Sequence, residues 1–508
     1  MPKRPEPDIR TVTVEGLAYG GAGVARSGGL VLFVPYGLPG DEVEVEVVEK
    51  KRDYGTVRIT ELLNPSTHRR APPCPAFGTC GGCQWLHLTY EEQLRAKAQI
   101  LQETLARLGG LHDAPIAPLI PSPHELHYRS RVRLQVRATA RGYQMGYYMA
   151  GSHTLVPLEG CPLADEAVND LWARLRQFLN DEERHAIGEI ELAYSPDERR
   201  AVALILPGGG GHPIHRPLLQ HCLERVPVLK GVIGGQRGGG WLTEGDPTLT
   251  YVVEVPGATF RCRAQAVSFF QVNLHLNPRL AESVLAAAGL QGGERVLDLY
   301  CGVGNLSLPL AARAGSLLGV DLSREAIQDA QANAREHSLT ACEFWRAEAG
   351  PALAQLQGEG DRFDVVVLDP PREGARGLME PLARLDPARI VYVSCNPTTL
   401  ARDLKALVKA GYRVTGVQGL DFFPQTFHLE CVAALERAPA LSRVLAPAPS
   451  DVAAPPQPAP EGPAAGPSAA PPETPPEAPA TPSPETSSDT LARATPEGPA
   501  AAPSGEPP

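Results

Sequence analysis

Cys395 is the side chain in this sequence best placed to act as a nucleophile. It follows a run of β-branched and aromatic residues, Ile390–Val393, which predicts a buried strand of a parallel sheet. A helical pattern begins at Pro397, so the thiol should lie at the carboxyl end of a strand, where open α/β sheets bind ligands. A nearby helix N-terminus favours the thiolate. The alternative is a small buried cysteine of the kind that many sheets contain.

The strands that neighbour Cys395 in the sequence also end in polar or reactive residues. From Gln271 onward, strand and helix patterns alternate, and candidate strands end at Tyr300, Asp321, Glu348, Asp369 and Cys395. The carboxyl ends of parallel strands meet at one edge of a sheet. These five ends therefore predict a doubly wound α/β sheet with a site along that edge.

The segment Arg295–Asn305, RVLDLYCGVGN, predicts a strand, a tight glycine turn and the start of a helix. Gly302 and Gly304 let the backbone approach a ligand closely, and Asp321 follows at the end of the next strand, where it can accept from ribose hydroxyls. Ser307 stands where the third glycine of a dinucleotide fingerprint would be, which counts against NAD. The combination indicates an S-adenosylmethionine site.

Three carboxylates complete the expected site. Glu348 ends the third strand and suits the adenine edge of the cofactor, and Asp369, in FDVVVLDPPREGA, ends the fourth. Glu430 lies in the final strand, and its neighbours Phe427 and Leu429 indicate a partly buried carboxylate whose pKa is raised and which can act as a base. A salt-bridged surface residue is the alternative reading of Glu430.

Three cysteines upstream have the spacing of a metal site. Cys74, Cys80 and Cys83 are separated by five and two residues and lie among glycines, and Cys161 stands alone much later. Thiolates that converge on one centre from flexible backbone are typical of metal ligation, and a fourth ligand from elsewhere is usual. Zinc and a [4Fe–4S] cluster both fit the bare spacing.

A strand with a basic face is predicted at Tyr128–Arg137, YRSRVRLQVR. Residues two apart share one face of a strand, and the apolar Val132, Leu134 and Val136 share the other. Such a strand buries one side and offers phosphates a basic ladder on the other, although a merely solvated face is an equal alternative. The ladder consists of Arg129, Arg131, Arg133 and Arg137.

The flanking segments divide the chain. Thr11–Leu63 alternates apolar and polar residues between glycine-containing turns, which predicts a small β-barrel. Leu88–Leu108 has helical spacing and ends at a glycine pair. Leu441–Pro508 holds 20 prolines in 68 residues and no aromatic residue, so this tail cannot bury a core and should be disordered.

Composition limits the class of protein. The 508 residues carry a formal charge of −11, which argues against a uniformly basic nucleic-acid binder. There is no long apolar run and no secretory signal pattern, so we expect a cytoplasmic protein whose ten cysteines are reduced or bound to metal. Nothing implies an obligate protein partner, and a monomer is expected.

The N-terminal segment resembles a TRAM domain, a small RNA-binding barrel. The resemblance rests on Glu15-Gly16, the Gly20–Gly23 run, Leu38–Asp41 and the Lys50–Arg52 cluster. From about Thr11 to Arg437 the whole chain resembles the RNA uracil-C5 methyltransferase family. The motifs that carry this resemblance are Ser268–Asn273 (SFFQVN), Asp298–Asn305 (DLYCGVGN), Asp369–Arg372 (DPPR), Ser394–Asn396 (SCN) and His428–Glu430 (HLE).

This resemblance implies a fold, ligands and roles. The expected fold is an OB-like TRAM barrel (1–68), a mixed α+β central domain (69–262) whose helix at 88–108 packs on the catalytic domain, a Rossmann-like class I methyltransferase domain (263–437) and the tail (438–508). It implies a [4Fe–4S] cluster on Cys74, Cys80, Cys83 and Cys161. It assigns S-adenosylmethionine contacts to Gln271, Tyr300, Asn305, Asp321, Glu348 and Asp369, with Asp321 where the family usually has glutamate.

The implied chemistry explains why a thiol is needed. Uracil C5 is too weak a nucleophile to attack a methylsulfonium, but addition of Cys395 to C6 places electron density at C5. Glu430 would then remove the C5 proton. The barrel and four cysteines are most similar to the branch that acts on 23S rRNA; a tRNA enzyme is the nearest alternative, and a non-catalytic RNA-binding or redox-sensing protein is a more distant one.

Overall fold

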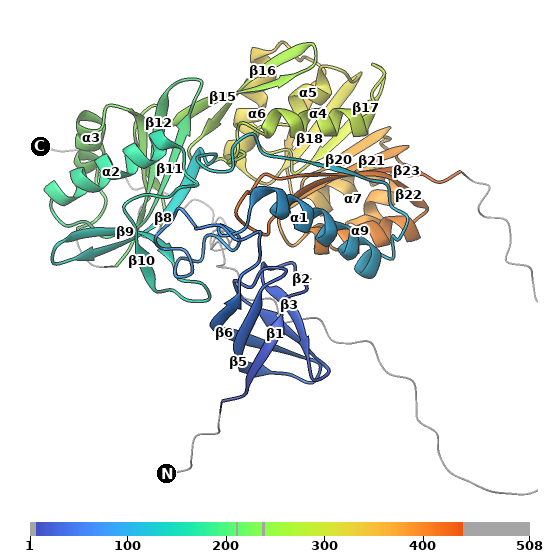
Figure 1. Ribbon diagram of the computed structural model, residues 1–508. Coiled ribbons are helices and arrows are strands. Elements are labelled where there is room, and N and C mark those ends of the chain that lie inside the picture. The colour runs from blue at the N-terminus through green and yellow to red at the C-terminus, as the bar shows by residue number, and fades with distance from the viewer. Residues whose placement is uncertain (1–6, 210–211, 236–238, 440–508) are drawn as a thin grey trace, which may run out of the picture. The chain divides into compact units, whose positions relative to one another are not determined.

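The computed structural model describes residues 7–209, 212–235 and 239–439, so almost all of the predicted tail at 438–508 lies outside the described residues (Figure 1). Apart from Gly151–His153, the described residues belong to one compact unit. No helix in these ranges is long and apolar enough to cross a membrane.

The N-terminal segment forms a strongly curled six-stranded sheet, dark blue in Figure 1. Alternate side chains such as Val12, Val43 and Val57 point inward and form a small core of their own. The predicted barrel is confirmed. Its strands lie in the order β1-β5-β6-β4-β3-β2, with the bounds β1 Ile9–Thr13, β2 Gly16–Leu17, β3 Gly23–Ser27, β4 Leu30–Val34, β5 Glu42–Lys50 and β6 Tyr54–Asn64.

The central segment is built on a seven-stranded mixed sheet in the order β10-β9-β8-β11-β12-β13-β14. Helices α2 (Glu166–Asp181) and α3 (Arg216–Arg225) pack on it, and Trp172 is fully buried in their common core. The strands are β8 Arg131–Thr139, β9 Gly142–Tyr148, β10 Leu155–Pro157, β11 Ile187–Ser195, β12 Arg200–Pro207, β13 Leu229–Gly235 and β14 Trp241–Gly245. A long hairpin follows, β15 (Thr248–Val255) and β16 (Ala258–Gln265).

The remaining segment is the doubly wound sheet that the sequence predicts. Its eight strands lie in the order β19-β18-β17-β20-β21-β23-β22-β7. Strands β17, β18 and β19 are added toward one edge of the sheet, and the chain then returns to add β20 and β21, in parallel, on the other side of β17. Such a switch in strand order between β17 and β20 is the kind of position where α/β sheets bind ligands. The bounds are β17 Arg295–Leu299, β18 Ser316–Asp321, β19 Cys342–Arg346, β20 Val365–Leu368, β21 Arg389–Ser394, β22 Tyr412–Leu420 and β23 Glu430–Arg437.

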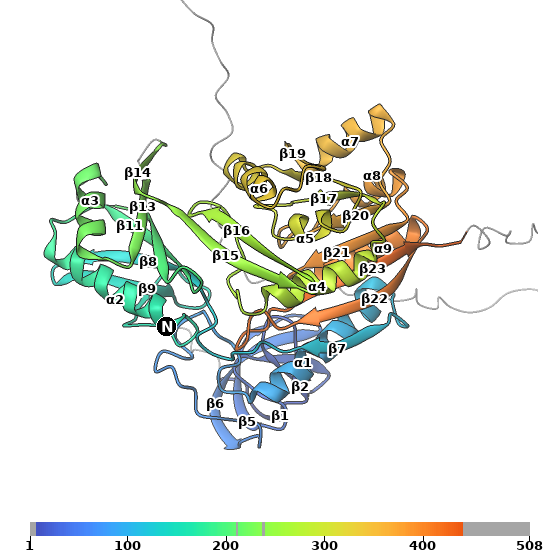
Figure 2. The same cartoon turned by 90° about the horizontal axis from the view of Figure 1, so that it is seen from above.

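Both faces of this sheet are covered by helices (Figure 2). Along β20, Val365 and Val367 join one core, whereas Val366 and Leu368 join the other, because successive strand residues point to opposite faces. The helices are α4 Asn277–Ala288, α5 Ser307–Ala311, α6 Arg324–Glu336, α7 Ala349–Glu359, α8 Met379–Arg384 and α9 Pro397–Lys409.

The eight-stranded sheet also includes a strand that comes before the central sheet in the sequence. Strand β7 (Ile116–Ile120) pairs in parallel with β22, which the sequence analysis did not predict. The helix expected at 88–108 is α1 (Tyr90–Thr104) followed by a π-helical turn at Leu105–Gly109. Gly110 ends it in a left-handed conformation, as the glycine pair predicts. Leu101 of α1 and Leu105 of the π-helical turn join a core of the eight-stranded sheet.

Candidate functional site

The turn that carries Cys395 is set by local chemistry. Strand β21 ends at Ser394 and α9 begins at Pro397, so Cys395 lies between them at the carboxyl edge of the sheet. Asn396 caps the helix, because its side chain accepts a hydrogen bond from the backbone N–H of Thr398 at 3.0 Å. The Cys395 side chain is half-buried. This is the placement that the strand–turn–helix pattern predicts.

Glu430 lies beside Cys395 on the neighbouring strand. Strands β21 and β23 are antiparallel with Ser394 opposite Cys431, so the register places the next pair, Cys395 and Glu430, side by side. Glu430 is only 4% exposed, and its Oε1 has no hydrogen-bond partner among the described residues. A buried carboxylate oxygen with no partner is costly, and such exceptions include groups at catalytic sites.

The electrostatics of Cys395 correct one expectation. Burial raises the pKa of the thiol to about 12, the carboxylates of Glu430 and Asp369 add to the shift, and Arg372 opposes it. The helix N-terminus does not outweigh these effects. The prediction that Cys395 favours the thiolate is therefore wrong for the protein without RNA, because the sequence could not show how far the sulfur is buried or that two carboxylates lie near it.

Glu430 is buried, as expected, and its role as a base remains a prediction. Burial raises its pKa well above the ordinary value, Asp369 adds to the shift and Arg372 lowers it. A raised pKa makes a carboxylate a stronger base once it is ionised. Arg372, to which the sequence analysis assigned no role, is therefore the cation that acts on both reactive groups. Its backbone carbonyl accepts from the Asn396 and Thr399 side chains, which ties the Asp369–Arg372 loop to the Cys395 turn.

A cleft next to this pair holds most of the predicted cofactor residues. Its lining includes the predicted Gln271, Tyr300, Gly302, Asn305 and Asp369, together with Phe269, Phe270, Asp298, Cys301, Val303 and Leu306. The cleft therefore joins the SFFQVN segment to the carboxyl ends of β17 and β20. Of the eight residues predicted for cofactor binding, Gly304, Asp321 and Glu348 are not among those that line it.

Asp321 still supports the cleft. Its Oδ2 accepts from the backbone N–H of Gly302 at 2.9 Å, and its Oδ1 accepts from that of Ser323 at 2.8 Å. Gly302 and Gly304 have φ of +55° and +89°, which is why glycine is needed in this turn. Glu348 is exposed at the start of α7. Its contact with a ligand remains a prediction.

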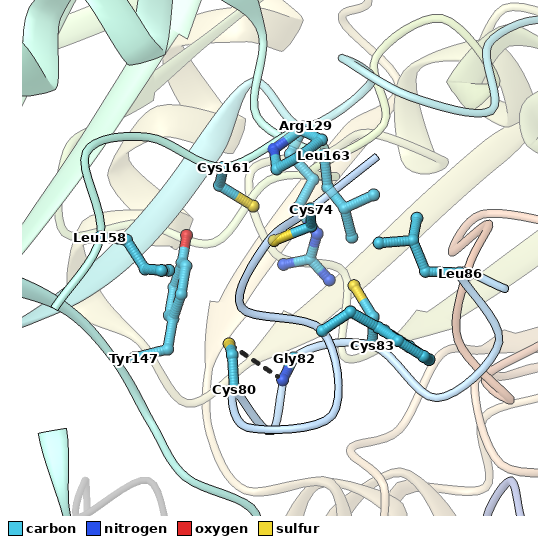
Figure 3. A pocket seen from close by; sticks show the side chains of 12 residues that line it. Cys74, Cys80, Gly82, Cys83, Leu86, Arg129, Tyr147, Leu158, Cys161 and Leu163 are labelled. Carbon is cyan, nitrogen blue, oxygen red and sulfur yellow. Dashed lines mark hydrogen bonds between the residues drawn. The ribbon is translucent and has the colours of Figure 1, made fainter. Parts of the chain in front are cut away.

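The four predicted metal-site cysteines come together around one cavity (Figure 3). Cys74, Cys80, Cys83 and Cys161 line a space of about 150 Å³, and Arg129, Tyr147, Phe77 and Leu86 are among the other residues of its wall. Burial raises the pKa of the Cys80 and Cys83 thiols, and the nearby cysteines raise it further. Within the described ranges, no three His, Cys, Asp or Glu side chains are arranged to hold a single metal ion.

The arginine ladder differs from its prediction. Arg129 precedes β8 and faces the cysteine cavity, where its Nε is buried without a partner among the described residues. Arg131 pairs with Glu191 on the adjacent strand and donates to the backbone oxygens of Ser268 (2.7 Å) and Ala266 (2.9 Å). These two arginines are therefore structural. Their neighbours across the sheet could not be read from one strand.

The outer half of the ladder keeps more of its predicted character. Arg133 is 46% exposed but pairs with Glu189 and Glu191, so its charge is largely compensated. Arg137 is exposed, and no acidic side chain in the described part of the chain pairs with it. Only Arg137 therefore matches the expected open basic position.

Comparisons with known proteins agree with this geometry. A family model described as tRNA (Uracil-5-)-methyltransferase matches residues 219–438, and a model described as TRAM domain matches residues 6–60. A 23S rRNA (uracil(1939)-C(5))-methyltransferase of Pectobacterium atrosepticum is 35% identical over 424 residues, which are 83% of this chain and 92% of that protein. An uncharacterized RNA methyltransferase of Gloeobacter violaceus is 37% identical over 446 residues, 84% of this chain and 96% of the relative.

A solved structure has the same fold. The Pyrococcus abyssi tRNA (uracil-54, C5)-methyltransferase in complex with S-adenosyl-L-homocysteine aligns with a TM-score of 0.62 and 25% identity, covering 84% of this chain and all of that one. The extent of these matches, the TRAM barrel and the doubly wound sheet lead to one conclusion. The chain belongs to the RNA uracil-C5 methyltransferase family and is an S-adenosylmethionine-dependent enzyme that acts on RNA.

Proposed function

We propose that this enzyme transfers a methyl group from S-adenosylmethionine to C5 of a specific uridine in 23S rRNA, through a covalent bond between Cys395 and C6 of the base. The observation that supports the mechanism is the register of β21 and β23, whose last pair, Ser394 and Cys431, directly precedes Cys395 and follows Glu430. Asp369, which lines the cofactor cleft, acts electrostatically on both of these groups. Support for 23S rRNA comes from the rRNA enzyme that matches most of this chain.

The residues of this cleft fit the cofactor. Backbone near Gly302 can approach a ligand closely, and Tyr300, Asn305 and Gln271 present polar groups to the space. S-adenosylmethionine, when bound, supplies an electrophilic methyl group on a sulfonium sulfur. The protein's task is to orient that group toward C5 of the base and to exclude water.

In the proposed reaction, covalent addition to the base precedes methyl transfer and proton removal. Cys395 loses its thiol proton to solvent, the resulting thiolate adds to C6, and the C5–C6 π electrons move to form an enolate. C5 then attacks the methyl group, and the electrons of the broken carbon–sulfur bond remain on the cofactor's sulfur. Glu430 removes the proton from C5, the C5–C6 double bond re-forms, and Cys395 leaves as thiolate. The uracil must leave any stacked arrangement to reach the sulfur, so extrusion from the RNA is expected.

The mechanism predicts different failures for two variants. Cys395→Ala lacks the nucleophile, so it should form no covalent RNA adduct and no product. Glu430→Gln cannot accept the C5 proton, so the methylated base should stay attached to Cys395. On a denaturing gel, a protein–RNA band should accumulate in Glu430→Gln only with S-adenosylmethionine. Normal turnover by Glu430→Gln, or activity in Cys395→Ala, would contradict these roles.

The RNA target is tested in cells. Mass spectrometry of rRNA and tRNA, with and without this protein, should show one or more 5-methyluridines in 23S rRNA that depend on it. A tRNA target is the second candidate, because the solved relative of similar fold is a tRNA enzyme. Loss of 5-methyluridine from tRNA alone would replace the rRNA assignment.

We also propose that the cysteine cavity holds a [4Fe–4S] cluster on Cys74, Cys80, Cys83 and Cys161. The support is that four thiols surround a space of about 150 Å³ instead of meeting at one point, as the ligands of a polynuclear cluster must. Protein purified without oxygen should be brown and contain iron and sulfide. Stoichiometric zinc without iron would overturn the cluster, and Cys161→Ser is the variant that should lower metal retention.

A further inference from the structure

The loop Asp421–Leu429 joins β22 to β23 and leads directly into Glu430. It contains no helix or strand, and six of its nine residues are buried. A buried loop must find hydrogen-bond partners for its backbone outside regular structure. Those partners come from segments far away in the sequence.

The first half of the loop is held by side chains. Lys97 of α1 pairs with Asp421 at 2.5 Å, and both side chains are fully buried. Three successive carbonyl oxygens then accept hydrogen bonds, Phe422 from Asn273 (3.3 Å), Phe423 from Lys97 (3.0 Å) and Pro424 from Tyr128 (3.1 Å). The loop is therefore fixed up to the residue before Gln425.

Gln425 is the point where most of these contacts converge. It is fully buried and has φ of +71°, a conformation that a non-glycine residue keeps only when its surroundings hold it. Gln93 of α1 holds it from both sides: Gln93 Oε1 accepts from the Gln425 backbone N–H, and Gln93 Nε2 donates to Gln425 Oε1, both at 2.8 Å. Arg70 also donates to Gln425 Oε1 at 2.9 Å, and Gln425 Nε2 donates to the Glu125 carbonyl at 3.2 Å.

The backbone of Gln425 is also hydrogen-bonded to the cysteine loop, the segment Cys74–Trp85 that contains Cys74, Cys80 and Cys83. Its carbonyl oxygen accepts from the backbone N–H groups of Gln84 (3.2 Å) and Trp85 (3.0 Å). These residues follow Cys83, which lines the cysteine cavity. Gln93 Nε2 donates to the Trp85 carbonyl as well, at 3.1 Å. One buried residue thus connects the cysteine loop, helix α1 and the loop that ends at Glu430.

We propose that Gln425 is a positioning residue, which ties the cysteine loop and α1 to the loop carrying Glu430 so that this carboxylate stays aimed at the C5 proton. The proposal rests on the proposed function, in which Glu430 is the base. Cys395 follows a different strand, β21, and the cofactor cleft lies at the ends of β17 and β20. Loss of the Gln425 contacts should therefore slow proton removal more than addition or methyl transfer.

The test compares substitutions at one position. Gln425→Ala removes all side-chain partners, Gln425→Gly removes them and also relieves the left-handed backbone, and Gln425→Glu keeps an acceptor for Gln93 and Arg70. A displacement of about 1 Å can cost about 100-fold in rate. We expect kcat per active site to fall about 10- to 100-fold in Gln425→Ala, with KM for S-adenosylmethionine nearly unchanged and the methylated adduct accumulating. Gln425→Glu should restore most of the loss.

Two further variants complete the experiment. Gln93→Ala removes the partner and should give the same adduct, and the double variant should be no worse than either single one, because the two residues act together. Gln99→Ala is the matched control, since Gln99 also lies on α1 but is exposed and bonded only to Glu103 in the described residues. It should behave as the unchanged enzyme.

The outcomes separate this proposal from the one it rests on. If Glu430→Gln accumulates the adduct but Gln425→Ala shows only less folded protein, with normal kcat per active site and no adduct, the positioning role is overturned and the mechanism stands. If the unchanged enzyme methylates RNA but Glu430→Gln forms no adduct, both fail together. An adduct in both variants, absent from Gln99→Ala, supports both.

Discussion

Cys395 lies where three charged side chains act on it in opposite directions. Glu430 and Asp369 raise the pKa of its thiol and Arg372 lowers it, on top of the larger effect of burial. A nucleophile held as the neutral thiol is protected from adventitious oxidation and alkylation, because the thiolate is the reactive form. Because the thiol is neutral, RNA binding or the charge on Arg372 must promote the ionisation of Cys395 before it adds to the base.

The charges around Cys395 predict how the rate of its alkylation by iodoacetamide depends on pH. With a pKa of about 12, the thiol should react slowly near neutral pH, and the rate should rise as the pH increases beyond the range where ordinary thiols level off. Glu430→Gln removes a negative charge and should speed the reaction at alkaline pH, whereas Arg372→Leu should slow it. Mass spectrometry of the modified peptide measures the rate, with Cys395→Ala as the blank. Equal rates in the two variants would contradict the assigned charges.

Among the elements, the strand ends could be predicted and the cross-strand partners could not. Tyr300 and Asp369 come directly after apolar residues, Cys395 comes two residues after an apolar run, and the structure places each directly after a strand. Strand runs and glycine turns are local signals, so one sequence carries them. Arg131 looked like a phosphate ligand because Glu191, 60 residues away, is invisible from its own strand. Strand β7 was missed for the same reason, since its partner β22 is distant in sequence.

Substitutions at two positions of the arginine ladder should therefore affect different properties: folding stability at Arg131 and RNA binding at Arg137. Arg131→Leu removes one of the two arginines that pair with the buried Glu191 and frees the Ser268 carbonyl, which should cost about 1–3 kcal/mol of unfolding free energy. Arg137→Ala should leave stability unchanged but weaken RNA binding and reduce its salt dependence by about one ion. Urea unfolding and RNA titrations at several salt concentrations measure the two effects. A stable Arg131→Leu protein that binds RNA weakly would restore the original ladder.

At the scale of the whole molecule, segments distant in sequence share one polar interior. Lys97, Asn273 and Gln425 come from α1, the SFFQVN segment and the β22–β23 loop, and all three are buried with hydrogen bonds between these elements. Buried polar contacts stabilise only the arrangement that satisfies them, so they specify how these elements pack. The sequence indicated each motif by its residues. It gave no sign of this network, because glutamine and lysine are ordinarily surface residues.

Folding stability should fall in mild acid because of buried histidines. Burial lowers the pKa of His87 to about 4 and that of His428 to about 3, whereas an unfolded histidine has a pKa of about 6.5. Since both folded values are depressed, the unfolded chain binds more protons below pH 6.5, and the stability present above that pH is lost as the pH falls toward 4. Carboxylates with raised pKa, such as Asp298 at about 7, act in the opposite direction, so the total slope alone does not isolate the histidines.

Comparing the pH dependence of stability in each variant with that of the unchanged protein isolates the contribution of one histidine from that of the carboxylates. In urea unfolding between pH 5 and 8, His87→Asn should lose less stability on acidification than the unchanged protein, by up to about 1.4 kcal/mol per pH unit, because one proton fewer is taken up on unfolding. His428→Asn should act in the same direction. His112→Asn, at an exposed position, is the control and should leave the slope unchanged. A parallel pH dependence in His87→Asn and the unchanged protein would mean that the His87 ring, although buried beside Tyr36, does not resist protonation.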